Sequence, residues 1–192
     1  MSWRILAINP GSTSTKMAVF DDENELFKVN ISHPVEQIQQ FSRVIDQFNF
    51  RKEVILKELE RAGIPRESIQ AVVARGGLLR PIPGGTYVVT DRMIEDLEAE
   101  DASNLGALIA NSLAAELHLP AYIVDPVVVD EMEDIARITG LPFIKRRSIL
   151  HALNQKRVAR QAARDLGRRY EEVNFIVVHM GGGRRVGAHR RG

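Results

Sequence analysis

The 192-residue sequence contains no cysteine, which excludes disulfide bonds, thiolate metal sites and cysteine nucleophiles. It has no run of about 18 uncharged apolar residues, so no segment predicts a transmembrane helix. The N-terminus also lacks the order of charged, apolar and small residues that marks a signal peptide. Together these absences predict a cytoplasmic protein without a membrane partner, and the length favours one domain with room for a small second one.

Aromatic residues are scarce, at 6% of the sequence, and this bears on the uneven distribution of charge. The net charge is only +1, but residues 145–192 carry thirteen Lys or Arg residues against three acidic ones. A basic segment of this kind can bind nucleic acid. Because no aromatic side chain stands within 156–169 to stack on bases, we favour a solvated helix face with a few phosphate ligands. Salt-dependent binding to DNA remains the weaker alternative.

Apolar runs and turn residues predict the element order βββ-α-β-α-β-α-β, in which consecutive helices are counted together and the short strand at 86–89 is left out. Strands are expected at 4–9, 15–21, 26–32, 69–74, 86–89, 121–124 and 175–178. Helices are expected from Pro34 to about 48, through 54–62, and at 91–97 with Asp91 as N-cap. Three more are expected at 105–117 with Ser103 or Asn104 as cap, at 131–138, and from about 149 to 169 with Ser148 as cap. An antiparallel meander followed by βα units indicates an α/β fold with one mixed sheet and helices on both faces.

A glycine-rich turn follows the first predicted strand, in the segment Asn9-Pro-Gly-Ser-Thr-Ser-Thr-Lys16. Its glycine allows close approach of the backbone to an anion, its hydroxyl groups can donate hydrogen bonds, and its lysine supplies a compact positive charge. The next residues alternate like a strand and no Walker motif is present, so this is not a P-loop. The pattern predicts a phosphate-binding hairpin formed by Asn9, Gly11, Ser12, Thr13, Ser14 and Lys16; an unliganded polar turn is the alternative.

A second glycine-rich turn ends the last predicted strand, in His179-Met-Gly-Gly-Gly183. Two such turns suggest that a nucleotide or phosphoryl group lies between them. Ligands of mixed sheets gather outside the carboxyl ends of strands. Because Asn9, Arg75, Asp125 and His179 all stand at such ends, we expect one composite site.

Three further side chains have chemistry suited to phosphoryl groups. Arg75 precedes two glycines and can fork onto a carboxylate or phosphoryl group, or form a surface ion pair. Asp125 can hold Mg²⁺ directly or through water, or close an Asx turn before Pro126. His151, in the first turn of a predicted helix, can face an anion or be an ordinary polar helix residue.

Several longer motifs resemble those of the butyrate kinases, in the acetate/butyrate kinase group of the actin, sugar-kinase and Hsp70-like superfamily. The resemblance covers nearly all of residues 3–183. The matching segments are Ala7–Lys16, Ala74–Leu78, Pro81–Gly85, Ala102–Gly106, Val124-Asp-Pro-Val-Val-Val-Asp-Glu-Met132, His151-Ala-Leu-Asn-Gln-Lys156 and Val178–Gly183. The resemblance implies a ribonuclease-H-like fold, the first domain of the acetate-kinase-type two-domain fold.

The activity implied by the resemblance is Mg²⁺-dependent transfer of the ATP γ-phosphoryl group to a short-chain carboxylate such as butyrate, which gives an acyl phosphate and ADP. By motif, Arg75, Asp125 and His151 match the catalytic residues, and Asp125 the carboxylate near Mg²⁺. The remaining matches form two phosphate loops: Asn9, Gly11, Ser12, Thr13, Ser14 and Lys16 in the first, and His179, Gly181, Gly182 and Gly183 in the second. For the intact family enzyme the resemblance also implies a homo-oligomer.

Family members are about twice this length, so we expect residues 1–174 to form the N-terminal kinase domain and 175–192 the first strand and phosphate loop of a truncated second domain. The family usually has an apolar residue and a small hydroxyl residue after the triple glycine, where this chain has Arg184 and Arg185. We therefore expect negligible turnover by the isolated chain. The alternative is a non-catalytic module that binds phosphate or acyl phosphate.

Overall fold

The computed structural model describes residues 2–97, 104–181 and 184–192. The chain divides into two compact units, each described here by itself. Unit 1 consists of Met1–Arg80 and Gly85–Val124, and unit 2 of Pro81–Gly84 and Asp125–Gly192. The expected division into domains at residue 174 concerns the longer family proteins and stays a prediction.

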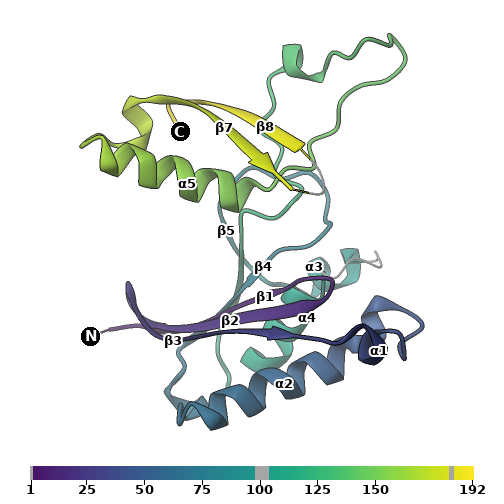
Figure 1. Ribbon diagram of the computed structural model, residues 1–192, viewed down its shortest axis with the longest axis vertical. Coiled ribbons are helices and arrows are strands. Elements are labelled where there is room, and N and C mark those ends of the chain that lie inside the picture. Colours follow the sequence, from purple (N-terminus) through teal and green to yellow (C-terminus); the bar gives the residue numbers. More distant parts are fainter. Residues whose placement is uncertain (1, 98–103, 182–183) are drawn as a thin grey trace. The chain divides into compact units, whose positions relative to one another are not determined.

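Unit 1 is built on a six-stranded mixed sheet with the order β3-β2-β1-β4-β6-β5 (Figure 1). Strands β1, β2 and β3 form the expected antiparallel meander, β4 and β6 run parallel to β1, and β5 closes the edge antiparallel to β6. The strands span Arg4–Pro10 (β1), Ser14–Asp21 (β2), Asn24–Ser32 (β3), Ala71–Arg75 (β4), Thr86–Val88 (β5) and Ala121–Val124 (β6). The predicted α/β class with a mixed sheet is therefore confirmed.

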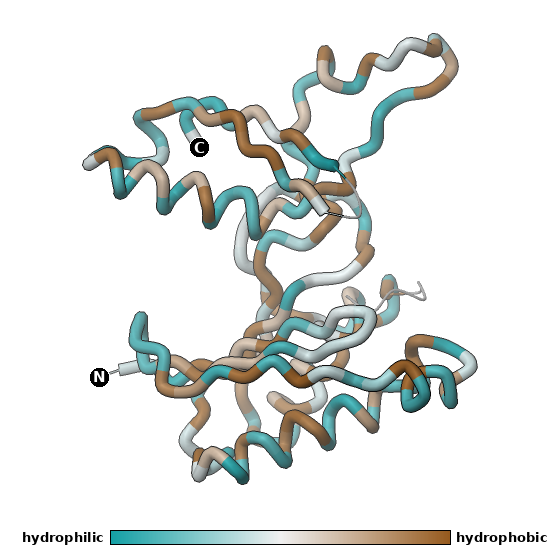
Figure 2. The backbone as a smooth tube through the Cα atoms, in the orientation of Figure 1, coloured by the Kyte–Doolittle hydropathy of each residue, from teal (hydrophilic) through white to brown (hydrophobic). Residues whose placement is uncertain are grey.

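The core of unit 1 lies on one face of this sheet. Leu6 and Ile8 of β1 and Met17 and Val19 of β2 are buried, and the residues between them face the other way. Helix α4 (Asn104–Glu116) packs on β1, β4 and β6 and against helix α2 (Phe48–Arg61) on this same face (Figure 1). Hydrophobic positions recur between hydrophilic ones along α2 (Figure 2), and one side of this helix is buried.

Several predicted helix boundaries in unit 1 are wrong. The helix expected from Pro34 to 48 is only the four-residue α1 (Val35–Ile38), followed by a 3₁₀ turn, η1 (Val44–Gln47), and a second 3₁₀ turn, η2 (Arg66–Ser68), precedes β4. Helix α3 (Asp91–Asp96) is capped by Thr90 rather than Asp91, because the Thr90 hydroxyl accepts a bond from the Met93 amide at 3.2 Å. Ser103 lies outside the described residues.

Unit 2 packs helix α5 (Ala152–Asp165) on a two-stranded antiparallel ribbon of β7 (Asn174–Met180) and β8 (Arg184–Arg190). Small residues of α5 and Tyr170, in the 3₁₀ turn η4 (Tyr170–Glu172), form a small core with Phe175 and Val177 of β7. Strand β8 is absent from the sequence-based prediction, because two arginines open it and a glycine interrupts it. Helix α5 begins at Ala152, not near 149, with His151 as its N-cap residue.

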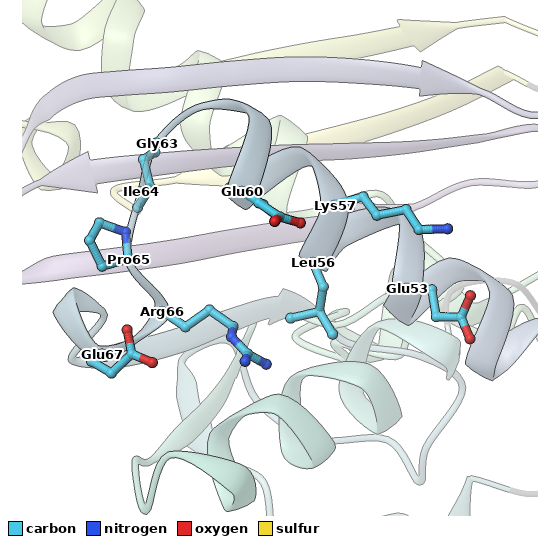
Figure 3. Close-up of a pocket in the computed structure, with 9 residues that line it drawn as sticks. All are labelled: Glu53, Leu56, Lys57, Glu60, Gly63, Ile64, Pro65, Arg66 and Glu67. Atoms are coloured by element: carbon cyan, nitrogen blue, oxygen red, sulfur yellow. The ribbon is translucent and has the colours of Figure 1, made fainter.

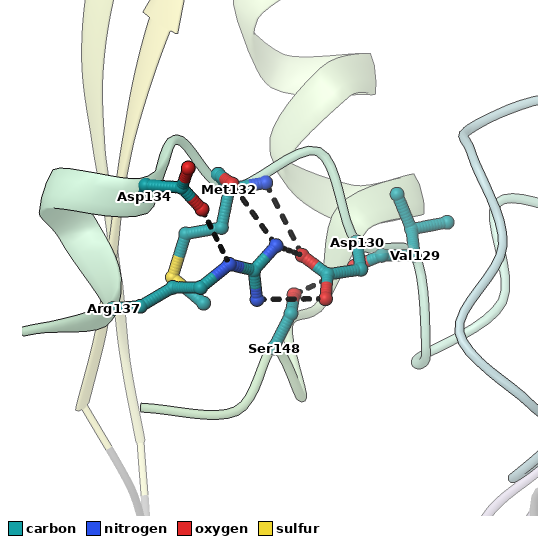
Figure 4. A network of polar contacts seen from close by, with 6 residues as sticks. All are labelled: Val129, Asp130, Met132, Asp134, Arg137 and Ser148. Atoms are coloured by element: carbon teal, nitrogen blue, oxygen red, sulfur yellow. Dashed lines mark hydrogen bonds and ion pairs between the residues drawn. The ribbon is translucent and has the colours of Figure 1, made fainter. Parts of the chain in front are cut away.

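The segment 125–150 of unit 2 is mostly irregular, and the helix expected at 131–138 is only the 3₁₀ turn η3 (Asp134–Arg137). The Arg137 guanidinium donates to both carboxylate oxygens of Asp130 at 2.8 and 2.9 Å and to the Met132 carbonyl, as Figure 4 shows. This bidentate bond holds the pKa of Asp130 below its ordinary value. Ser148 does not cap a helix: its hydroxyl donates to the Val129 carbonyl at 2.6 Å.

No helix of the described ranges is both long enough and apolar enough to cross a bilayer.

Candidate functional site

Residues 9–16, here called the anion hairpin, join β1 to β2 in unit 1. The Gly11 amide donates to the Ser14 carbonyl at 2.7 Å and closes the turn. The Thr13 carbonyl accepts from the His33 amide at 2.9 Å, which ties the turn to the end of β3. Ser12 and Thr13 are exposed at the tip, and Ser14 is half-buried. The predicted hairpin is thus present, with hydroxyl groups at its solvent side.

Three charged or polar side chains line up across neighbouring strands beside this turn. Asn9 pairs directly with Lys16 in the β1–β2 register. In the parallel β1–β4 register Ile8 pairs with Ala74, so that Asn9 and Arg75 come next in line. Because Ile8 and Ala74 are buried, alternation places Lys16, Asn9 and Arg75 on the opposite face of the sheet from the helices. The sheet therefore brings two cations and an amide together on one face.

The turn that follows Arg75 is held by the start of α4. The Asn104 side-chain oxygen accepts from the Leu78 amide at 2.6 Å, and Asn104 is 2% exposed. A Cβ on Gly77 would lie 1.9 Å from that oxygen, so only glycine fits there. Gly106 lies equally close, since a Cβ there would be 2.6 Å from the Arg75 carbonyl. Glycines in this part of the chain therefore let helix and strand end approach each other.

A buried arginine of α2 supports the anion hairpin from the core side. Arg51 donates to the main-chain oxygens of Ser14 at 2.9 Å and Ser12 at 3.0 Å. It also donates to the Thr15 hydroxyl, which lies 2.8 Å from the buried ring of His33. Burial, and then the charge of Arg51, lower the pKa of His33, so that this ring is neutral at pH 7. Sequence reasoning missed Arg51, because a lone arginine within a helix shows no pattern.

In unit 2, Asp125 lies at the point where the chain leaves β6, and it is 5% exposed. Its φ angle is +39°, a conformation that costs a non-glycine residue about 1 kcal/mol and that Asp tolerates better than most. A Cβ on Gly84 would lie 3.1 Å from an Asp125 oxygen, 2.6 Å from Glu131 and 2.1 Å from the Lys156 amine. Gly84 is therefore surrounded by two carboxylates and an ammonium group, and a side chain there would displace the ends of Lys156 and Glu131.

Lys156 and Glu131 form the ion pair of this cluster. The Lys156 amine lies 2.8 Å from one Glu131 oxygen and 2.9 Å from the other, which also accepts from the Gly84 amide at 2.7 Å. Burial acts to raise the pKa of Glu131, but the bonds from Lys156 and Gly84 outweigh it and keep the pKa below its ordinary value. The prediction of a helix at 131–138 therefore missed a charged cluster beside Asp125.

The rings of His151 and His179 lie next to each other in unit 2. His151 Nδ1 lies 3.2 Å from His179 Nε2, and His179 Nδ1 lies 3.2 Å from the Asn154 side-chain oxygen. Because that oxygen can only accept, His179 carries its proton on Nδ1 and accepts at Nε2 from His151. In its neutral form, His151 then keeps Nε2 unprotonated. The network fixes the orientation of the two rings relative to each other.

A second histidine network lies along α5. The Tyr170 hydroxyl is 2.5 Å from His189 Nδ1, and His189 Nε2 is 3.2 Å from the Gln155 side-chain oxygen. Burial, and then Lys156, lower the pKa of His189, which matches a neutral ring that donates from Nε2 and accepts from Tyr170. Gln155 is fully buried, and its side-chain nitrogen has no hydrogen-bond partner among the described residues.

Within the described ranges no group of three or more His, Asp or Glu side chains could hold a metal ion. Mg²⁺ commonly uses one or two carboxylates and takes its other ligands from water and substrate phosphates. Asp125, with Glu131 nearby, fits that mode, whereas a site made only of protein ligands does not fit.

A surface hollow of unit 1 lies elsewhere. It has a volume of about 630 Å³ and is lined by the end of α2 and residues 63–67, as Figure 3 shows. It contains none of the predicted site residues. Gly182 and Gly183 of the predicted second phosphate loop lie outside the described residues, and Gly181 is exposed at the end of β7.

No family model matches the chain. In sequence, the chain is 54% identical over 194 residues to Butyrate kinase 1 of Clostridium acetobutylicum. The match covers 99% of this chain and 55% of that protein, so the chain spans about half the length of the curated relative that it matches.

In structure, the chain is similar to an acetate kinase from Porphyromonas gingivalis, with a TM-score of 0.68 at 18% identity over 98% of this chain and 55% of the other. It is also similar to a propionate kinase from Francisella tularensis, with a TM-score of 0.60 at 17% identity over 97% and 54%. These likenesses establish the fold predicted for the first domain of this group.

Proposed function

We propose that this chain, a homologue of about half of a butyrate kinase, supplies the phosphate-binding and phosphoryl-transfer residues of a carboxylate kinase. The reaction is attack of a carboxylate oxygen of a short-chain acid such as butyrate on the γ-phosphorus of ATP, with ADP as the leaving group. The bond from the γ-phosphorus to the ADP oxygen breaks as the new oxygen–phosphorus bond forms. The products are an acyl phosphate and ADP.

The observation that carries this proposal is the row of Lys16, Asn9 and Arg75 beside the anion hairpin in unit 1. Lysine and backbone amides suit the phosphate chain of ATP, and the arginine fork suits the planar carboxylate or the transferred phosphoryl group. In phosphoryl transfer the protein acts chiefly by positioning and charge stabilisation. The residue types in this row supply both.

For unit 2 we propose that Asp125 acts near Mg²⁺ and that His151, in its protonated form, donates from Nε2 to the transferred phosphoryl group. Mg²⁺, when bound, would neutralise charge on the phosphates, with Asp125 as its protein ligand. His179, which hydrogen-bonds to His151, would hold that ring in place and lie next to the glycines of the second phosphate loop. The proposal includes a cytoplasmic location, where ATP is available, and a homo-oligomer for the intact enzyme.

The test is a hydroxamate assay for acyl phosphate. We compare the 192-residue chain with a chimera in which the part of Butyrate kinase 1 that this chain does not match is joined to it. The chimera is expected to form butyryl phosphate from ATP and butyrate, and the chain alone to show negligible turnover. Asp125→Asn in the chimera should lower turnover at least 100-fold, whereas Arg61→Ala, on the exposed side of α2, should leave it unchanged.

Two outcomes would refute the proposal. A folded chimera without butyrate-dependent product contradicts the assigned activity, and an Asp125→Asn chimera with full activity contradicts the assigned role of that carboxylate. A folded chimera that binds ATP or butyryl phosphate but shows no turnover would instead favour a non-catalytic binding module.

A further inference from the structure

Arg51 is fully buried on the core side of the anion hairpin, and each of its five N–H donors makes a hydrogen bond. Two bonds go to the main-chain oxygens of Ser12 and Ser14, one to the Thr15 hydroxyl, and two to the side-chain oxygen of Gln47. Arg51 therefore has no donor left for a ligand, and any part it plays in binding is indirect.

This placement is costly for stability. None of the four oxygen atoms that accept these five bonds belongs to a carboxylate, so the guanidinium charge is buried without an ion-pair partner among the described residues. Arg51 also lies near the N-terminus of α2, where the helix dipole disfavours a cation, and the first turn of α2 contains no acidic residue. A residue that violates two rules of helix and core stability indicates a compensating role in function.

The contacts of Arg51 bear on the conformation of the turn. The Ser14 carbonyl accepts from Arg51 at 2.9 Å and from the Gly11 amide at 2.7 Å, so one oxygen joins the turn to the core. The Ser12 carbonyl also points inward, to Arg51 at 3.0 Å. With these two oxygens turned toward the core, negative partial charge is removed from the solvent side, where the exposed Ser12 and Thr13 lie.

We propose that Arg51 is a positioning residue that pre-organises the anion hairpin and supplies the buried positive charge that a phosphate bound there neutralises. The inference rests on the proposed function, since it deepens the role of the same hairpin. His33 takes no charge in this arrangement, because burial and the charge of Arg51 both lower its pKa.

The first test measures hydrogen exchange of the Gly11 amide in the ligand-free 192-residue chain. Arg51→Met is expected to accelerate exchange at Gly11 at least tenfold beyond the change in global stability. Leu59→Ala, at a buried apolar position of the same helix, is the stability-matched control, and Arg61→Ala is the charge-matched control. If Arg51 has only a structural role, Arg51→Met and Leu59→Ala will each raise the exchange rate of the Gly11 amide in proportion to the loss of global stability.

The second test measures binding of sodium tripolyphosphate by calorimetry. Arg51→Met is expected to weaken binding about tenfold, or about 1.4 kcal/mol. Arg51→Lys, which keeps the charge but has three donors in place of five, should fall between Arg51→Met and the parent chain. Where Arg51→Met does not fold, Gln47→Leu removes the acceptor of two of the five bonds and should act in the same direction.

The outcomes separate the two proposals. A folded Arg51→Met chain with parental Gly11 exchange and parental affinity overturns the inference about Arg51 alone. A parent chain that does not bind tripolyphosphate contradicts the phosphate site of the proposed function, while the exchange comparison still decides whether Arg51 positions the hairpin.

Discussion

Substitution of Gly106 by alanine tests the close approach of α4 to the strand ends of unit 1. A Cβ at this position would lie 2.6 Å from the Arg75 carbonyl, 3.4 Å from Pro10 Cδ and 3.5 Å from Ala74 Cβ. The first distance is about 0.8 Å below the 3.4 Å at which ordinary van der Waals contact begins. Because the atom it meets belongs to the main chain, the helix or the end of β4 must move.

The expected cost follows from two opposing terms. Overpacking of this kind destabilises by about 1–3 kcal/mol, and a contact with a main-chain atom places Gly106→Ala in the upper part of that range, at about 2–3 kcal/mol. The higher helix propensity of alanine than of glycine offsets about 1 kcal/mol of that loss. The net loss of about 1–2 kcal/mol corresponds to a fall of roughly 2–8 °C in the melting temperature for a chain of this size.

The assay is urea or thermal denaturation of the 192-residue chain followed by circular dichroism, together with tripolyphosphate binding. Gly140→Ala is the matched control, since a Cβ there would meet nothing within 4 Å. It should leave stability within about 0.5 kcal/mol of the parent. Because Arg75 and Pro10 border the anion hairpin, Gly106→Ala should also weaken phosphate binding. Equal stability of Gly106→Ala, Gly140→Ala and the parent would refute the close packing described for α4.

Two further predictions concern charge. The pKa of His33 is lowered in the folded chain, so between that value and the ordinary value of 6.5 the unfolded chain binds more protons, and stability falls as the pH decreases. His33→Gln should therefore reduce the difference in unfolding free energy between about pH 7.5 and about pH 5.5. An unchanged dependence of the unfolding free energy on pH would contradict the role assigned to His33. The Lys156–Glu131 pair is partly exposed on the Glu131 side, at 46%, so Lys156→Met should cost the isolated chain less than about 1 kcal/mol. In the active chimera, Lys156→Met removes a charge beside Asp125 and should lower turnover at least tenfold in the hydroxamate assay. A large loss of stability together with full turnover would contradict this prediction.

The opening meander of unit 1 and its mixed sheet could be predicted from the sequence, because apolar runs with short polar turns have few other solutions. The same reasoning gave the anion hairpin, since glycine, hydroxyl groups and lysine follow an apolar strand. The register that places Asn9 beside Lys16 and Arg75 could not be read from either segment alone, because it depends on pairing between strands distant in sequence.

Helix boundaries were less accessible for physical reasons. Residues 35–48 have apolar side chains at helical spacing, but the structure uses them in two short turns before α2. Residues 131–138 also looked helical, yet Asp130 is bonded to Arg137 and Glu131 to Lys156. Such long-range partners decide the conformation of charged segments, and sequence periodicity does not contain them.

The residues that support the site were the least predictable. Arg51 and Gly84 have no motif that separates them from ordinary helix and loop residues. Their roles emerge only from burial and from the atoms that they meet. His151 and His179 were selected from their places beside a helix start and a glycine-rich turn, and the structure brings them within 3.2 Å.

The most direct measurement is an NMR titration of the 192-residue chain with ATP, observed at the backbone amides. If the anion hairpin holds the phosphates, the largest changes in amide chemical shift will fall on Gly11, Ser12, Thr13 and Ser14. These changes will be lost in Lys16→Met, and this variant should still fold because Lys16 is exposed. Saturating ATP that leaves these amides unmoved, or moves them equally in Lys16→Met, would contradict the account.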